Sequence, residues 1–169
     1  DTFSIITNNL VDKNVSIRDA KVIELNDGSC IYNFYTDMPK GDAYDIENKI
    51  ESLIGNLSLR LEKKQVTRKK KFKLPRRLRS FRTSTKVNFL EDHVHNRTVL
   101  EMVSIDRPGL LVDISQVLRR NNIWIESAKI ATIGERAEDV FYLRNEHQDA
   151  IPLETIKRLE SELIESLDN

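Results

Sequence analysis

Apolar and polar residues alternate along several short segments of this chain, and a period of two is typical of half-buried β-strands. The alternation predicts strands at 30–35, 85–90, 99–104 and 139–143, and two more within 10–22 and 118–130. Residues 1–7 also have the pattern of a strand. We therefore expect a protein rich in short strands, with helices in the intervals between them.

Three intervals carry apolar residues at the three- and four-residue spacing of an amphipathic helix. These stripes are Ile46, Ile50, Leu53, Ile54, Leu57 and Leu61; Leu110, Leu111, Ile114, Val117 and Leu118; and Ile156, Leu159, Leu163 and Leu167. Asp42 stands where an N-cap of the first helix is expected, and Pro152 stands where the third begins. Each helix is expected to bury the face that carries its stripe.

The chain contains an internal repeat. Residues 10–22 align with 118–130, and Leu, Asn, Ile, Ala and Lys are identical in place. Each copy turns into a second strand and then a helix, and the first turn, Asn26-Asp27-Gly28, is a strong hairpin signal. The order strand, helix, strand, strand, helix is most of a ferredoxin-like βαββαβ sandwich. The prediction is an α+β protein with two ferredoxin-like domains, 1–64 and 85–169, joined by a basic linker at 65–84.

Two features depart from this plan. Only Asn8 and Asn9 separate Thr7 from Leu10, whereas a parallel crossover needs about ten or more residues. We therefore expect the first helix of domain 1 to be missing from the sequence after Thr7. Domain 2 lacks a strand after its last helix, so we expect residues 85–90 to take that place beside 99–104. Residues 71–74 could supply an edge strand to domain 1.

Charge is distributed unevenly, although the formal net charge is zero. Eleven Lys or Arg and no acid lie at 63–82, which leaves 16 basic and 27 acidic residues elsewhere. We favour a solvated connector that faces the acidic domains. The alternative is a nucleic-acid-binding segment, in which these cations neutralise phosphates and Phe72 stacks on a base.

The cysteine content and the hydropathy of the sequence indicate the cellular compartment. The single cysteine, Cys30, has no partner for an internal disulfide, which fits a reducing compartment and predicts a cytoplasmic protein. No segment has the length and hydropathy of a membrane span or a signal peptide. Because the chain begins without Met, inside what looks like a strand, we expect it to be part of a longer protein.

The run I-D-R-P-G-L-L at 105–111 is the strongest candidate for a binding site. Asp106 is expected to cap the following helix, with Pro108 in its first turn, and Gly109 lets another molecule approach the backbone closely. Free N–H groups at a helix N-terminus suit a small carboxylate. The alternative is that Asp106 only caps the helix and that Pro108-Gly109 only turns the chain.

The sequence offers few signs of catalysis or metal binding. His93 and His95 lie beside Asp92 in a predicted loop, but no third ligand is evident, so we expect a solvated loop and no metal site. No phosphate-binding glycine loop and no Ser/His/Asp set is present. Glu138-Asp139 is interpreted as part of a hairpin or interface. We expect this segment to have no catalytic activity of its own.

Three runs carry a family resemblance: 105–111, Asn122-Ile123, and A-K-I-A-T-I-G-E-R-A-E-D-V-F at 128–141. They resemble an ACT domain. With residues 75–78 and 87–90, they are similar to the C-terminal tandem ACT domains of bifunctional PII uridylyltransferase/uridylyl-removing enzymes. The resemblance covers most of 72–169 and is weaker over 1–62.

The resemblance implies a regulatory role in sensing glutamine. Enzymes of this family attach UMP to the signal protein PII when glutamine is scarce and remove it when glutamine is plentiful. Their nucleotidyltransferase and hydrolase domains precede the ACT pair, so the resemblance implies no cofactor in this segment; the Mg²⁺ that the family uses belongs to those catalytic domains.

The resemblance also implies which residues would bind glutamine. In ACT domains an amino acid binds between the strand-to-helix loop of one unit and a strand of its partner. The residues carried over are Asp106, Arg107, Pro108, Gly109, Leu110 and Leu111 of the loop, Asn14, Val15, Ser16 and Ile17 across the interface, and Asn121, Asn122 and Ile123 at the equivalent edge of domain 2. Asp106 would meet the α-ammonium, and the helix N–H groups would meet the α-carboxylate.

A second function class stays open at this point. ACT sheets often join side by side, within a chain or between chains, so the segment could serve only to dimerise the enzyme or to dock PII. Dependence on an amino-acid ligand distinguishes the sensor from the interaction module.

Overall fold

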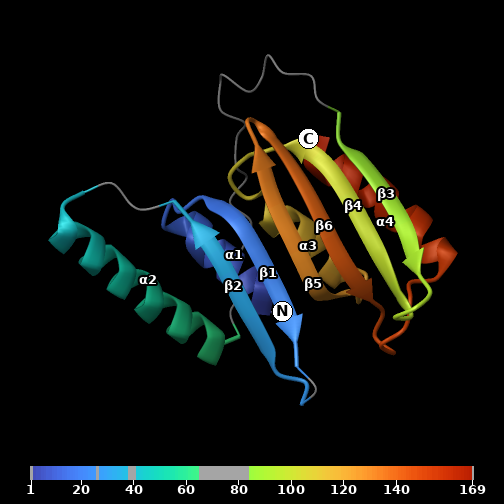
Figure 1. Cartoon of the computed structure of the whole chain (residues 1–169), viewed down its shortest axis with the longest axis horizontal. Coiled ribbons are helices and arrows are strands. Elements are labelled where there is room, and N and C mark those ends of the chain that lie inside the picture. Colours follow the sequence, from blue (N-terminus) through green and yellow to red (C-terminus); the bar gives the residue numbers. More distant parts are fainter. Residues whose placement is uncertain (1, 26, 38–40, 65–83, 169) are drawn as a thin grey trace.

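The computed structural model describes residues 2–25, 27–37, 41–64 and 84–168. Its elements in chain order are α1 (Thr2–Asp12), β1 (Ile17–Glu24), β2 (Cys30–Thr36), α2 (Ala43–Glu62), β3 (Lys86–Asp92), β4 (Arg97–Ile105), α3 (Leu110–Arg120), β5 (Trp124–Ile133), β6 (Arg136–Arg144) and α4 (Leu153–Asp168). The strands form one antiparallel sheet in the order β2-β1-β5-β6-β4-β3 (Figure 1). The α+β class and the ferredoxin-like antiparallel sheet are thus confirmed.

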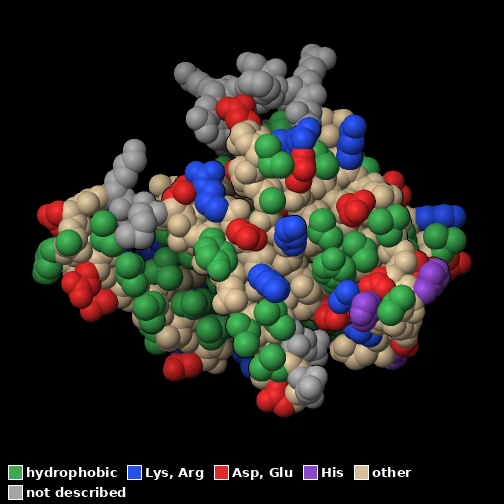
Figure 2. All heavy atoms as spheres, in the orientation of Figure 1, with side chains coloured by type: hydrophobic (Ala, Val, Ile, Leu, Met, Phe, Trp, Pro, Cys, Tyr) green, Lys and Arg blue, Asp and Glu red, His purple; other side chains and the backbone are tan. Residues whose placement is uncertain are grey.

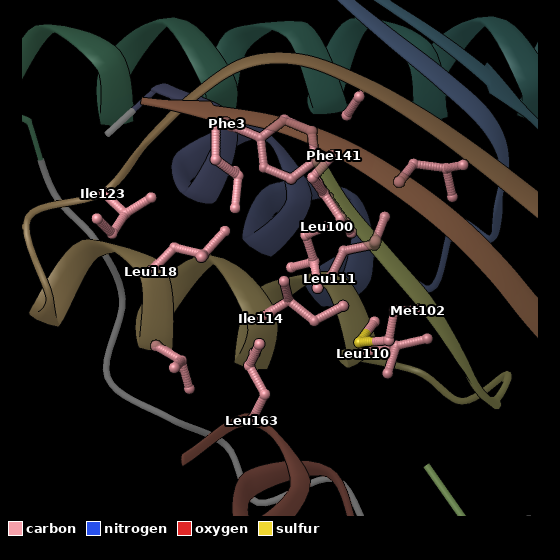
Figure 3. Close-up of a cluster of buried hydrophobic side chains, with 14 of the residues drawn as sticks. Phe3, Leu100, Met102, Leu110, Leu111, Ile114, Leu118, Ile123, Phe141 and Leu163 are labelled. Carbon is pink, nitrogen blue, oxygen red and sulfur yellow. The ribbon is translucent and has the colours of Figure 1, made fainter. Parts of the chain in front are cut away.

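The hydrophobic core lies between the sheet and the helices behind it, α1, α3 and α4 (Figure 1). The alternation predicted from the sequence sends Leu100 and Phe141 inward from neighbouring strands, where they meet Ile114 and Leu118 of α3 (Figure 3). These four side chains are at most 1% exposed, so each contributes about 1.5–3 kcal/mol through burial.

β3 completes the sheet from the N-terminal side, as expected for residues 85–90. It pairs antiparallel with β4, with Phe89 opposite Leu100. Just before the strand, the Thr85 hydroxyl donates a 2.6 Å hydrogen bond to Asp168 near the end of α4. This bond joins the sheet edge to the last turn of the last helix.

Residues 2–12 form a continuous helix, so the strand predicted at 1–7 is wrong: Thr7 and Asn8 both lie within α1. The expectation that residues are missing after Thr7 stays a prediction. Phe3, Ile6 and Leu10 recur at helical spacing and are at most 8% exposed. This buried stripe stabilises a helix where the short alternation suggested a strand. The order α1-β1-β2-α2 therefore repeats the order α3-β5-β6-α4.

α2 begins as predicted, with the Asp42 side chain accepting a hydrogen bond from the N–H of Asp45 at 2.9 Å. The apolar stripe is less buried than expected: Ile46, Leu53, Leu57 and Leu61 are half-buried, Ile50 and Ile54 are exposed, and no residue of α2 is fully buried. In Figure 1 the helix lies beside β2, and it contacts α1 through polar bonds such as Asn9 Nδ2 to the Leu53 carbonyl. The matching helix α4 does bury its stripe, at Leu159, Leu163 and Leu167.

The two repeats meet where β1 pairs antiparallel with β5, at Lys21 opposite Lys129. The proposed linker at 65–84 and the suggested edge strand at 71–74 lie outside the described residues, apart from Ser84. Within the described part of the chain, no helix combines the length and hydropathy needed to cross a bilayer.

Candidate functional site

A cavity of about 280 Å³ lies where the end of β4 meets the end of α1. One wall is the loop from β4 to α3, and the other is the turn from α1 to β1. Its lining residues are Val11, Asn14, Val15, Ser16, Ile17, Arg18, Asp106, Arg107, Pro108, Gly109, Leu110, Leu111, Ile130, Thr132, Gly134, Ala137 and Asp139. Ten of these belong to the thirteen predicted site residues, so the structure brings both predicted segments, 14–17 and 106–111, to one cavity.

The loop before α3 is held in place by backbone bonds. The N–H of Asp106 donates to the Glu135 carbonyl at 2.9 Å, and the N–H of Leu110 donates to the Arg107 carbonyl at 3.1 Å. Gly109 occupies the N-cap in the left-handed region at φ 83°, a conformation that a Cβ disfavours. Since no side chain caps this end, the expected cap by Asp106 is wrong, and Pro108 lies in the loop before the first turn.

This geometry leaves the Asp106 carboxyl beside the cavity instead of on the helix end. The next N–H groups of α3, at Leu111 and Val112, have no carbonyl one turn earlier within the helix, as at any helix start. They give the N-terminus its partial positive charge. A carboxyl group and a helix N-terminus therefore stand at the same cavity.

Asn14 shapes the opposite wall through the end of α1. It adopts a left-handed conformation at φ 57°, its N–H donates to the Val11 carbonyl, and the N–H of Val15 donates to Leu10. This is the C-terminal cap that asparagine tolerates better than most residues. The repeat has the same cap at Asn122, φ 55°, which explains physically why both copies carry Asn at this place.

Asn121, Asn122 and Ile123 do not line this cavity. They follow the opposite end of α3, where the Asn121 side chain bonds to Glu162 at 2.9 Å and Arg158 at 2.9 Å, and Ile123 is buried in the core. The structure thus separates these three residues from the other ten, and their role in binding a ligand stays a prediction.

Both arginines at the cavity are already paired. Arg18 makes two bonds to Asp37, at 2.8 and 2.6 Å, which raise the pKa of Arg18 and lower that of Asp37. Arg107 is folded back onto α3, with Nη2 2.7 Å from Asp113. Arg18 nevertheless acts on half-buried Asp106: burial raises the pKa of Asp106, and Arg18 and Thr132 offset part of that rise.

Asp139 is the residue that sequence reasoning missed. It lies on β6 between Ala137 and Phe141 in the inward-facing register, is 1% exposed, and neither of its carboxyl oxygens accepts a hydrogen bond of normal geometry among the described residues. Burial raises its pKa to about 7, an effect that the nearby backbone of Ala131 opposes and Asp106 reinforces. The sequence does carry one signal for Asp139, because it is an acid among inward-facing positions of β6 that are otherwise apolar. The interpretation of Glu138-Asp139 as part of a hairpin or interface passed over this signal.

Other polar groups show no comparable arrangement. His95 lies 2.9 Å from Asp92 and His93 lies 3.3 Å from Glu91, where the end of β3 turns toward β4. Among the described residues, no three His, Cys, Asp or Glu side chains are grouped so that they could hold a metal ion. The cavity between the α1–β1 turn and the β4–α3 loop is therefore the candidate binding site.

Comparison with known proteins supports the assignment of the fold. Residues 98–161, from β4 into α4, match the ACT domain model. The chain is 36% identical over 162 residues to a bifunctional uridylyltransferase/uridylyl-removing enzyme of Photobacterium profundum and 34% identical over 163 residues to that of Vibrio cholerae. Each match covers 96% of this chain.

These relatives are much longer proteins, because the chain spans only 18% of each. No solved structure is similar enough to match. The predicted resemblance to the ACT domain and to this group of enzymes is confirmed. Residues 98–161 therefore belong to the ACT domain family, and the chain as a whole is similar to a region of bifunctional uridylyltransferase/uridylyl-removing enzymes that contains this domain.

Proposed function

We propose that this region senses glutamine by binding it in the cavity between the α1–β1 turn and the β4–α3 loop. The observation that carries the proposal is the convergence of a helix N-terminus and a partly buried carboxyl, from segments far apart in sequence, at one cavity. An amino acid presents the two complementary charges. ACT domains typically bind amino acids, and the named activities of the relatives suggest a regulated enzyme.

In this proposal each end of the amino acid has its own partner. The α-carboxylate lies at the N-terminus of α3, near the N–H groups of Leu111 and Val112. The α-ammonium lies against Asp106, where a charge-assisted hydrogen bond is stronger than one between neutral groups. Gly109 lets the ligand approach the backbone. Arg18, held by Asp37, stands at the exposed end of the cavity.

Regulation follows from the position of the cavity between the repeats. We propose that α1–β1–β2–α2 and β3–β4–α3–β5–β6–α4 are two ACT domains in tandem. A ligand between them favours the arrangement of the two domains that it binds more tightly. The equilibrium between the arrangements shifts by no more than the difference in the ligand's affinity for them. The enzyme's catalytic domains, with their Mg²⁺, would respond by changing the balance between uridylylation and deuridylylation of PII in the cytoplasm.

A second candidate is an interaction module without a ligand. Hydrophobic side chains gather over α2 and β2 in Figure 2, and Tyr35, Tyr44 and Ile54 are 66%, 74% and 55% exposed. Such a surface suits docking of another copy or of PII. Nucleic-acid binding stays the weaker alternative, since the basic run at 63–82 lies between segments that carry an excess of acidic residues.

The test is a thermal-shift and calorimetric titration of the 169-residue chain with glutamine, and with glutamate, asparagine and serine as controls. Glutamine at a hundred times its dissociation constant should add about 2.7 kcal/mol to the free energy of unfolding. A selective response supports the sensor. No response to any amino acid would contradict it and favour the interaction module.

A further inference from the structure

Asp139 is a buried acid at the inner side of the cavity, and among the described residues no side chain bonds to its carboxyl group. It is 1% exposed, lines the cavity, and leaves both oxygens without hydrogen bonds of normal geometry in the described part of the chain. Burying a carboxyl in this state destabilises a fold, and buried polar groups are normally hydrogen-bonded. A group of this kind facing a cavity points to a ligand that supplies the missing donors.

No positive charge at the cavity is free to neutralise Asp139. The charged side chains that line the cavity are Arg18, Asp106, Arg107 and Asp139. Arg18 is held by Asp37 at 2.6 Å and Arg107 by Asp113 at 2.7 Å. Asp106 adds negative charge, as its unfavourable effect on ionised Asp139 indicates.

We propose that Asp139 is the specificity-determining contact of this cavity, selecting an amino acid with an uncharged carboxamide side chain and rejecting one with a side-chain carboxylate. This inference rests on the proposed binding of an amino acid. An ionised carboxylate only accepts hydrogen bonds, and a carboxamide offers two N–H donors. A carboxylate of the same size offers none and adds a like charge beside Asp106 and Asp139.

Glutamine and glutamate have side chains of the same size but different charge. A difference between their affinities therefore reports selection by charge and hydrogen bonding, and not by shape. Selection by Asp139 should therefore follow its ionisation. Since its pKa lies at about 7, the preference for glutamine should rise between pH 6 and pH 8. Selection by shape alone would be the same at both pH values.

The experiment titrates glutamine and glutamate by calorimetry into the full chain at pH 6 and pH 8. It compares the wild type with Asp139→Asn and with Asp19→Asn, an equivalent change at an exposed β1 residue outside the cavity. In the wild type and in Asp19→Asn, the preference for glutamine should be about tenfold or more at pH 8 and several-fold smaller at pH 6. In Asp139→Asn it should fall to about twofold at both pH values, since the neutral amide accepts and donates.

Each other outcome has a defined meaning. If Asp139→Asn keeps the wild-type preference, the inference is overturned and glutamine binding at the cavity stands. If the wild type binds neither amino acid at pH 8, both proposals are overturned. If Asp139→Asn does not fold, the wild-type titrations alone test the inference. An equal preference for glutamine at pH 6 and pH 8 would then overturn selection by the charge of Asp139.

Discussion

At the scale of single residues, the unusual features of this protein gather around one cavity. Asp139 is an acid in a register that is otherwise apolar, and Gly109 holds a left-handed conformation at a helix start. Asp106 lines the same cavity, and its backbone N–H donates a hydrogen bond to the Glu135 carbonyl. A buried titratable group with a shifted pKa, beside a cavity, is typical of functional sites.

The buried carboxyl of Asp139 should make stability depend on pH. Burial raises its pKa from 3.8 to about 7, so the folded state holds the proton more tightly than the unfolded state. The resulting stabilisation is complete below pH 3.8 and is lost as pH rises through 7. Relative to Asp139→Asn, the wild type should lose up to roughly 4 kcal/mol between pH 4 and pH 8.

Urea denaturation of both proteins across this pH range measures the difference. Asp19→Asn is the control, because it removes an exposed carboxyl from β1 and should track the wild type. A constant difference between wild type and Asp139→Asn at every pH would contradict the assigned burial of a titrating group.

Gly109 should be required for binding beyond its effect on stability. Gly109→Ala places a Cβ at φ 83°, which costs about 1–2 kcal/mol, and relief of this strain displaces the loop that faces the ligand. We expect glutamine affinity to fall by about tenfold or more. The matched control is Gly28→Ala at φ 80°, in a hairpin turn outside the cavity with nothing within 4 Å of the added Cβ.

Calorimetric titration of both variants with glutamine separates the two effects. The control should lose similar stability and keep wild-type affinity. Equal loss of affinity in both variants would mean that general destabilisation, and not the loop, determines binding.

At the scale of elements, the strands were predictable and the N-terminal helix was not. Alternation identified the strands of the second repeat, because inward positions such as Leu100 and Phe141 are apolar. Over residues 1–7 the apolar residues fit both periods, and the helix is favoured by the packing of α1 against its neighbours, α2 and α3 among them. The helix cap at Asn14 was not predicted, because residues 10–22 alternate like a strand and the cap depends on α1, which precedes it.

The two helices of the first repeat should differ sharply in their contribution to stability. Phe3 of α1 is 1% exposed and packs 5.8 Å from the Phe34 ring, whereas Ile54 of α2 is 55% exposed. Phe3→Ala should lower the free energy of unfolding by about 3–5 kcal/mol through loss of burial and the resulting cavity. Ile54→Ala should change it by no more than about 0.5 kcal/mol.

Guanidinium denaturation of the two variants tests this contrast. Similar losses for Phe3→Ala and Ile54→Ala would contradict the placement of α1 in the core and of α2 outside it.

At the scale of the whole molecule, the repeats share one sheet and one cavity. The β1–β5 pairing joins them, and the cavity takes one wall from each. The sequence repeat and the ACT resemblance together predicted ten of the lining residues, because both loops precede or follow recognisable elements. Asp139 and Arg18 escaped prediction since their roles depend on which strands become neighbours.

Hydrogen exchange of the full chain with and without glutamine tests the central claim most directly, because it reports both walls of the cavity at once. A bound ligand should slow exchange together at 14–18 and at 106–112, and leave the α2 backbone unchanged. Protection confined to 121–123, or no change at a glutamine concentration that saturates any binding, would contradict a glutamine site shared by the two repeats.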